Sequence, residues 1–133
     1  MMQASLGAIL YVSELADGHD ASCVGSILST ARALNALHGE TGVLVFDGER
    51  FCQYVEGDIS KLQTLRTNLL HDQRHKNFIV LADVPIEQRA FDQFRMGYTD
   101  MEDVDALGAI AATRGHEAVA SFLALASRCD VQT

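Results

Sequence analysis

Proline, tryptophan and basic residues are all scarce in this chain of 133 residues. A single proline beside a hydrophobic content of 48% excludes a long disordered segment and indicates a globular protein. The chain has 10 basic and 18 acidic residues, and its net charge of −8, with no basic patch, repels nucleic acids and anionic membranes. The apolar start at residues 6–12 is too short to span a bilayer and lacks the flanks of a signal peptide. We therefore expect a cytoplasmic protein without a nucleic-acid or membrane partner.

The cysteines and histidines show no spacing that is typical of a metal site or of a disulfide framework. The cysteines, Cys23, Cys52 and Cys129, are odd in number and far apart. This distribution indicates reduced, structural thiols, since free cysteine is often buried. We expect no bound metal.

Alternating strand and helix periods predict an α+β fold with one hydrophobic core. The expected strands are residues 6–12, 41–46, 50–56, 78–84 and 94–97, and the expected helices are about 21–37 and 59–69. Asp47-Gly48 is a strong hairpin signal, and Ser60 with Gln63 offers a capping box. The order matches a ferredoxin-like β-α-β-β-α-β plan with an extra strand, which predicts a mixed sheet with two helices on one face.

The pattern beyond Gly97 is helical again and predicts a C-terminal extension. Its two apolar stripes, separated by Gly115, are Val104, Leu107, Ile110 and Ala111, and then Val119, Phe122, Leu123 and Ala126. This extension is too short for an independent core. We expect a main domain at residues 1–97 and a helical extension at 98–133 that packs on the free face of the sheet or on a partner.

Three polar side chains lie where the pattern predicts burial. Asn35 continues the apolar stripe of the first helix, Gln53 lies between two apolar residues on one face of a strand, and Tyr11 ends an apolar strand. A buried amide without a partner costs about 1–3 kcal/mol, so a shared polar ligand would satisfy these groups. Each also has a plain interpretation: a half-buried strand tyrosine, an amide that caps the helix end, and a solvent-facing strand glutamine.

The segments around these residues resemble the BLUF family of blue-light sensors, which use FAD. Residues 35–46 (NALHGETGVLVF) and 51–57 (FCQYVEG) are similar to the family's central signature. Further matching segments, in the same order, are residues 10–13 (LYVS), 72–75 (DQRH) and 85–96 (PIEQRAFDQFRM). The resemblance spans about residues 6–97 and implies a flavin-binding photoreceptor that is not an enzyme.

The resemblance also implies a flavin ring between the first two helices. Residues expected to line it are Ile27, Leu28, Ala31, Leu62 and Leu69, although the same stripes are equally explained as plain core. Asn35 would bind the polar edge of the ring. Asp72 would contact the ring or pair with Arg74. A small basic cluster of Arg74, His75 and Lys76 would face the dinucleotide phosphates, with Arg74 and His75 as the binding residues, or form a solvated turn.

The implied photoactive switch consists of Tyr11, Gln53 and Met96. In the family's mechanism, Tyr11 gives an electron and a proton to the light-excited flavin through Gln53, and the hydrogen bonds of this amide are rearranged when the charge returns. Met96 would repack as the last strand moves. With no output enzyme on the chain, the resemblance implies signalling to a partner protein in trans and a homo-oligomer.

Four positions depart from the family pattern. Leu34 replaces a polar residue, Glu40 an aliphatic one, Asn68 an arginine found in some relatives, and Phe94 a tryptophan. These departures leave open a flavin-free regulatory module of the same fold, which colour would distinguish. An acylphosphatase-like enzyme is less well supported because the phosphate-cradling loop is missing, and a flavin oxidoreductase because the nicotinamide fingerprint is missing.

Overall fold

A computed structural model describes residues 5–18, 21–98 and 105–129. Its elements are β1 (Leu6–Leu15), α1 (Ala21–His38), β2 (Thr41–Phe46), β3 (Arg50–Asp58), α2 (Ile59–Leu70), β4 (His75–Pro85), β5 (Phe94–Tyr98), α3 (Ala106–Ala111) and α4 (Gly115–Arg128). The order of helices and strands expected from the sequence is therefore confirmed. Strands β1, β3 and β4 extend beyond their expected ends, because ladder pairing continues past the apolar runs.

The strands form one mixed sheet in the order β4-β1-β3-β2-β5. Strand β2 pairs in parallel with β5, and the other neighbours are antiparallel. Gly42 lets β2 approach β3 closely, since it has φ 148° and a Cβ there would overlap the carbonyl group of Tyr54. This topology confirms the expected α+β class with a mixed sheet.

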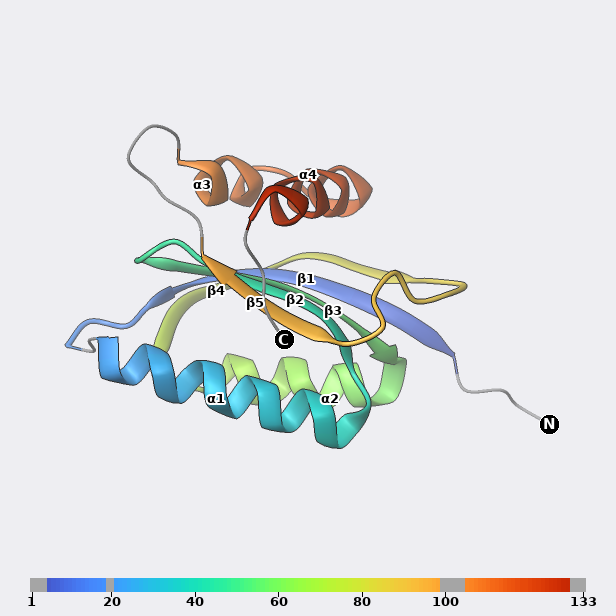
Figure 1. Cartoon of the computed structure of the whole chain (residues 1–133), viewed down its shortest axis with the longest axis horizontal. Coiled ribbons are helices and arrows are strands. Elements are labelled where there is room, and N and C mark those ends of the chain that lie inside the picture. Colours follow the sequence, from blue (N-terminus) through green and yellow to red (C-terminus); the bar gives the residue numbers. More distant parts are fainter. Residues whose placement is uncertain (1–4, 19–20, 99–104, 130–133) are drawn as a thin grey trace.

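Helices cover both faces of the sheet (Figure 1). Helices α1 and α2 lie on one face, and α3 and α4 lie on the other. The larger hydrophobic core lies between the sheet and helices α3 and α4, and in it Leu107 and Phe122 pack with Leu10, Val43 and Tyr54. Val104, assigned to the first C-terminal stripe, lies outside the described residues. The division of the chain at residue 97 stays a prediction.

The start of α2 corrects one expectation. The N-cap is Asp58, whose side chain accepts a hydrogen bond from the backbone N–H of Ser60 at 2.9 Å. The capping box assigned to Ser60 and Gln63 was therefore wrong. Strand β3 ends at Asp58, directly before the helix, whereas Ser60 is already the second residue of α2, and an aspartate is as good an N-cap as a serine.

Glu56 fixes the loop between β4 and β5 to the end of the sheet. Its side chain is fully buried and accepts hydrogen bonds from Thr41 Oγ1 at 3.0 Å and from the backbone N–H groups of Ala90 and Phe91 at 2.9 and 2.6 Å. A buried carboxylate needs such partners, because burial of an unpaired charge is very costly. The loop is thereby held against the end of the sheet formed by β2 and β3.

Candidate functional site

A cavity that is partly open to solvent lies between α1, α2 and the sheet, and its empty volume of about 620 Å³ includes open solvent. Its lining residues are Tyr11, Ser13, Ile27, Thr30, Ala31, Leu34, Asn35, Leu44, Phe51, Gln53, Leu65, Asn68, Leu69, Asp72, Arg74 and His75. Its walls come mainly from the inward stripes of the two helices, and its floor comes from alternate residues of β1, β2 and β3. The lining is mostly apolar with neutral polar side chains such as Ser13, Asn35 and Gln53, and its charged residues Asp72 and Arg74 directly precede β4.

Tyr11 and Gln53 form a buried hydrogen-bonded pair on the floor of this cavity. They are direct partners in the antiparallel ladder of β1 and β3, and Tyr11 Oη donates to Gln53 Oε1 at 2.5 Å. The side chains are only 4% and 2% exposed, respectively. Burial raises the pKa of the Tyr11 phenol far above its usual value, and the charges of Cys52 and Asp72 act in the same direction. The phenol therefore keeps its proton across the physiological pH range.

Asn35 contributes two unsatisfied polar groups to the same cavity. The residue is 1% exposed, and neither Nδ2 nor Oδ1 has a hydrogen-bond partner. Its backbone carbonyl accepts from the Glu40 N–H at 2.8 Å, so the helix end is capped by the main chain and the amide is left unused. Ser13 Oγ, two residues after Tyr11 on β1, is likewise buried without a partner. Unsatisfied polar groups are uncommon in folded proteins and point to a missing partner.

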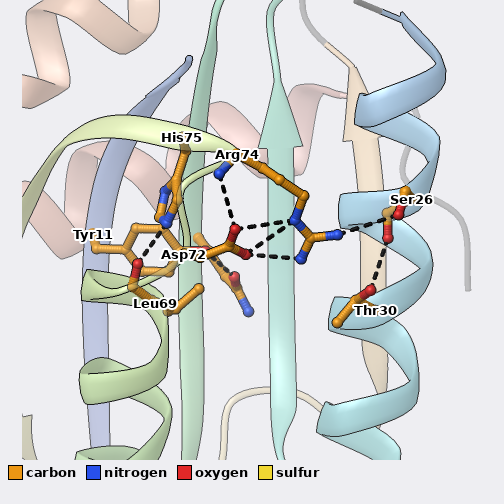
Figure 2. A network of polar contacts seen from close by, with 8 residues as sticks. Tyr11, Ser26, Thr30, Leu69, Asp72, Arg74 and His75 are labelled. Carbon is orange, nitrogen blue, oxygen red and sulfur yellow. Dashed lines mark hydrogen bonds and ion pairs between the residues drawn. The ribbon is translucent and has the colours of Figure 1, made fainter. Parts of the chain in front are cut away.

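An ion-pair network bridges the mouth of the cavity (Figure 2). Arg74 Nη2 lies 2.8 Å from Asp72 Oδ2, and Arg74 Nη1 donates to Ser26 Oγ on α1 at 3.2 Å. The hydrogen bond from the Arg74 side chain lowers the pKa of Asp72 below its ordinary value. Of the two expected roles of Asp72, the structure contains the pairing with Arg74. A guanidinium and a carboxylate thus lie at the solvent end of an apolar slot.

His75 and Phe78 support Tyr11 from the side of β4. The Phe78 ring lies 4.9 Å from the Tyr11 ring and 5.7 Å from the His75 ring, measured between centroids. The His75 Nε2 atom lies 2.6 Å from the Leu69 carbonyl oxygen and forms a hydrogen bond with it. Lys76 pairs instead with Asp17 at 2.8 Å and does not line the cavity. Only part of the expected basic cluster therefore reaches the site.

Met96 lies beside the site and does not line it. On β5 it is the ladder partner of Leu44, which in turn is the partner of Gln53. One strand therefore separates Met96 from the glutamine. Its sulfur accepts a hydrogen bond of 3.6 Å from Arg32 Nη2 on α1.

The structure gathers most of the other expected site residues. Ile27, Ala31 and Leu69 line the cavity, whereas Leu28 packs with the apolar cluster of Phe46 and Phe51, outside the cavity lining. Leu62 packs in a separate cluster of Ile9, Val55, Leu65 and Leu69 and is not among the lining residues. Leu28 is adjacent to the lining residue Ile27, and Leu62 lies about one turn before the lining residue Leu65, so helical periodicity alone does not separate lining residues from core residues.

Several lining residues were not expected from the sequence, namely Ser13, Thr30, Leu44, Phe51 and Leu65. Strand alternation was the available signal for two of them, because Ser13 and Phe51 each lie two positions from Tyr11 or Gln53. Leu44 depends on the pairing of β2 with β3, which places it opposite Gln53. That pairing is a property of the tertiary structure, and no short segment of the sequence shows it.

The described residues give no sign of a metal centre or of a membrane helix. Within residues 5–18, 21–98 and 105–129, no group of three or more histidine, cysteine, aspartate or glutamate side chains is placed to hold a metal ion. In the same part of the chain, no helix is long and apolar enough to cross a membrane. Cys52 is buried as a free thiol, and Cys129 is half-buried.

Comparisons with known proteins agree with this geometry. Residues 6–97 match the family described as BLUF, sensors of blue light using FAD. A relative from Escherichia coli (strain K12), the blue light- and temperature-regulated antirepressor BluF, is 27% identical over 96 residues, which are 72% of this chain. The matched region is only 24% of the length of that relative.

Solved structures of the family have the same fold. BlrB, a BLUF protein in its dark state, aligns with a TM-score of 0.72 at 25% identity over 91% of this chain and 94% of its own. BlsA in its photo-activated state gives 0.65 at 27% identity over 74% and 71%. A third structure, BlrP1 from Klebsiella pneumoniae, shares the fold at a TM-score of 0.64 and has 28% of its length covered. Because the family match covers more than half of the chain and includes every element around the cavity, the chain belongs to the BLUF family of blue-light sensors.

Proposed function

We propose that this chain binds FAD noncovalently in the cavity between α1 and α2 and acts as a blue-light photoreceptor. The observation that carries the proposal is the pair of unsatisfied polar atoms on Asn35, which face the same cavity as the Tyr11–Gln53 hydrogen bond. A flat ring with polar atoms on one edge would satisfy the amide and leave the apolar walls in contact with its faces. The residues present therefore fit the cofactor of the family.

The chain's own side chains divide the binding task between the two ends of the slot. Asn35 and Gln53 would hold the polar edge of the ring at the inner end, and Ile27, Ala31 and Leu69 would pack on its faces. Arg74 and His75 at the mouth would bind the dinucleotide phosphates, because a guanidinium forms charge-assisted hydrogen bonds with phosphate oxygens. Binding there would compete with the Asp72–Arg74 ion pair. Most of the binding free energy would then come from contacts at the buried inner end of the slot.

When bound, FAD supplies a ring that absorbs blue light and is a strong oxidant in its excited state. Tyr11 is placed to give up an electron, and its phenolic proton has one direct acceptor, Gln53 Oε1. Gln53 carries both a donor and an acceptor, so it can pass a proton on one side and offer a changed set of hydrogen bonds on the other without carrying a net charge. When the electron and proton return to Tyr11, the amide is left in its new arrangement. The proposed signal is this altered hydrogen-bond network.

The signal would leave the site through the strands beside Gln53. Leu44 and Met96 continue the ladder from Gln53 to the edge strand β5, and Met96 contacts Arg32 of α1. We infer that Met96 repacks with the photostate and that the changed surface is read by a partner protein in trans. The antirepressor function belongs by name to the E. coli relative. We further propose a cytoplasmic homo-oligomer that is a sensor and not an enzyme, with its light-sensing unit at residues 1–97 and a helical extension at 98–133.

Absorption spectroscopy of the purified full chain tests the proposal. Protein made in cells supplied with flavin should be yellow, contain FAD on extraction, and shift its visible band to the red under blue light before returning in the dark. Colourless protein that cannot be reconstituted with FAD, FMN or riboflavin would instead support the second candidate, a flavin-free regulatory module. Leu34 and Glu40, at two departures from the family pattern, favour that candidate.

A further inference from the structure

Glu40 is a buried acidic residue whose carboxyl group has no hydrogen-bond partner. It is 3% exposed, and neither Oε1 nor Oε2 has a hydrogen-bond partner. The residue links α1 to β2, and it packs so closely on β3 that a Cβ on Gly57 would lie 3.2 Å from Glu40 Cγ. A carboxyl group in this position, without hydrogen bonds, is more stable neutral than ionised. The photochemistry proposed above makes no use of it.

Glu40 shares a second cavity with Asn35. This cavity is separate from the flavin slot, and its lining includes Asn35, Glu40, Arg32, Arg89 and Phe91. Asn35 is the residue common to the linings of the two cavities. Its unsatisfied amide therefore lies between the proposed flavin edge and the space that holds the unsatisfied carboxyl group. The two groups are not bonded to each other directly. A neutral carboxyl group and a primary amide each carry a donor and an acceptor, so one water molecule in this cavity can bridge them.

Charged groups from several elements lie near Glu40. Arg32 of α1 and Arg89 and Asp92 of the β4–β5 loop line the same cavity, and Lys61 of α2 acts on the Glu40 charge. Glu56 of β3 is the ladder partner of Thr41, the residue after Glu40, and His38 lies two positions earlier in the chain. Burial raises the pKa of Glu40 to about 7, and the positive charges of Lys61 and Arg89 oppose this rise. Ionised Glu40 can only accept hydrogen bonds and is attracted to these two cations. Neutral Glu40 loses that attraction and gains a donor for Asn35.

We propose that Glu40 is a positioning residue: when neutral it donates, through a water molecule in the second cavity, toward the Asn35 amide oxygen, and when ionised it is drawn to Lys61 and Arg89 and no longer donates, so that the proton on Glu40 sets the hydrogen bond that Asn35 offers to the flavin edge. The proton exchanges with solvent through the second cavity, and no other bond changes. The link to flavin rests on the proposed function, but the link between Glu40 and Asn35 is a property of the chain itself.

The first experiment follows the Asn35 side-chain amide by NMR in the ¹⁵N-labelled, flavin-free full chain between pH 5.5 and 8.5. Its signals, identified by their loss in Asn35→Ser, should move with a midpoint near pH 7. Glu40→Gln should hold them at one position across the range, and Glu87→Gln, which removes an exposed carboxylate, should leave the titration unchanged. Signals that stay still in the unmodified chain, or that titrate equally in Glu40→Gln, overturn the proposal.

The second experiment repeats the titration on the FAD-loaded chain and records the position of the visible flavin band. The band should shift with the same midpoint, stay fixed in Glu40→Gln, and stay fixed at a different position in Glu40→Leu, which has no polar group. A titrating Asn35 in a chain that never binds flavin refutes the proposed function and leaves the coupling intact. If the chain binds flavin and is photoactive, but its visible flavin band and its Asn35 NMR signals do not change with pH, the coupling is refuted and the proposed function is left intact.

Discussion

Tyr11 and Gln53 face one another across the β1–β3 ladder, with the tyrosine hydroxyl donating to the glutamine carbonyl oxygen at 2.5 Å. The backbone pairing fixes this contact, because directly opposite residues in an antiparallel ladder have their side chains on the same face. The pair is buried and lies on the floor of the proposed flavin cavity. The first predictions test what each partner does there.

Replacing Gln53 with leucine should leave flavin bound and abolish the light-induced red shift. Leucine has about the right size for the buried position but cannot accept from Tyr11 or bond to the ring edge. The measurement is the visible spectrum of the loaded variant before and during blue light. Gln63→Leu, on the exposed side of α2, is the matched control and should shift normally. A full-sized shift in Gln53→Leu would assign the switch to another residue.

Replacing Tyr11 with phenylalanine should keep flavin bound and prevent the red-shifted state from accumulating. The phenyl ring keeps the packing against Phe78 but has no acidic proton and is much harder to oxidise. Flavin fluorescence should rise, because the excited state loses its nearest electron donor. Tyr54→Phe is the control, since Tyr54 belongs to the opposite core layer under α4, where its hydroxyl group contacts Glu56. Normal photoconversion in Tyr11→Phe would refute the proposed mechanism even with flavin bound.

Replacing Asn35 with alanine should stabilise the flavin-free chain at pH 8.5, where ionised Glu40 no longer donates to the Asn35 amide, and should weaken flavin binding. The variant removes a buried, unsatisfied amide whose burial costs about 1–3 kcal/mol, and loses part of this gain to a small cavity. We expect a net gain of about 1 kcal/mol in the free energy of unfolding in urea, and a loss of tenfold or more in FAD affinity by fluorescence titration. Gln63→Ala should change neither quantity. A destabilised variant would mean that Asn35 has partners in the ligand-free state.

The stability of the chain should fall as pH rises from about 4.5 to 7, in part because of Glu40. The folded-state pKa of about 7 lies above the ordinary value of 4.5, so the folded chain holds a proton that the unfolded chain has already released in this range. The shift corresponds to on the order of 3 kcal/mol at pH 8. Glu40→Gln should therefore be more stable than the unmodified chain at pH 8 and about equal to it at pH 4.5. Urea unfolding at both pH values measures this, and Glu87→Gln should show no such gain.

Replacing Glu56 with alanine should destabilise the chain by about 3–4 kcal/mol, because several donors, including two backbone N–H groups, lose a fully buried acceptor. The β4–β5 loop should detach first, since those two N–H groups belong to it. Hydrogen exchange at Ala90 and Phe91 would detect the detachment, and urea unfolding would give the total. Glu87→Ala, in the same loop but exposed, should change stability by less than about 0.5 kcal/mol.

Local pattern was sufficient for the elements of this fold. The 3.6-residue stripes of α1 and α2, the alternation in β1 and β3, and the Asp47-Gly48 turn are all properties of short segments, and each predicted its element. The inward direction of Asn35 followed from the same periodicity, and its burial is confirmed. The N-cap of α2 did not follow, because Asp58 and Ser60 are both good caps and only the end of β3 selects between them.

Strand register and helix packing determined the contacts between distant segments that form the site. The sequence by itself determined which residue types occupy which faces, since hydrophobic period and turn chemistry are encoded within a few residues. Only the tertiary structure decided that Tyr11 opposes Gln53, that Leu44 separates Met96 from the site, and that Arg74 reaches Ser26 across the slot. Only the tertiary structure left the Glu40 side chain buried, without a hydrogen-bond partner, in the cavity that it shares with Asn35. The physical reason is that a contact between distant segments depends on strand pairing and helix packing, which are set by the whole core at once and by no single stretch of chain.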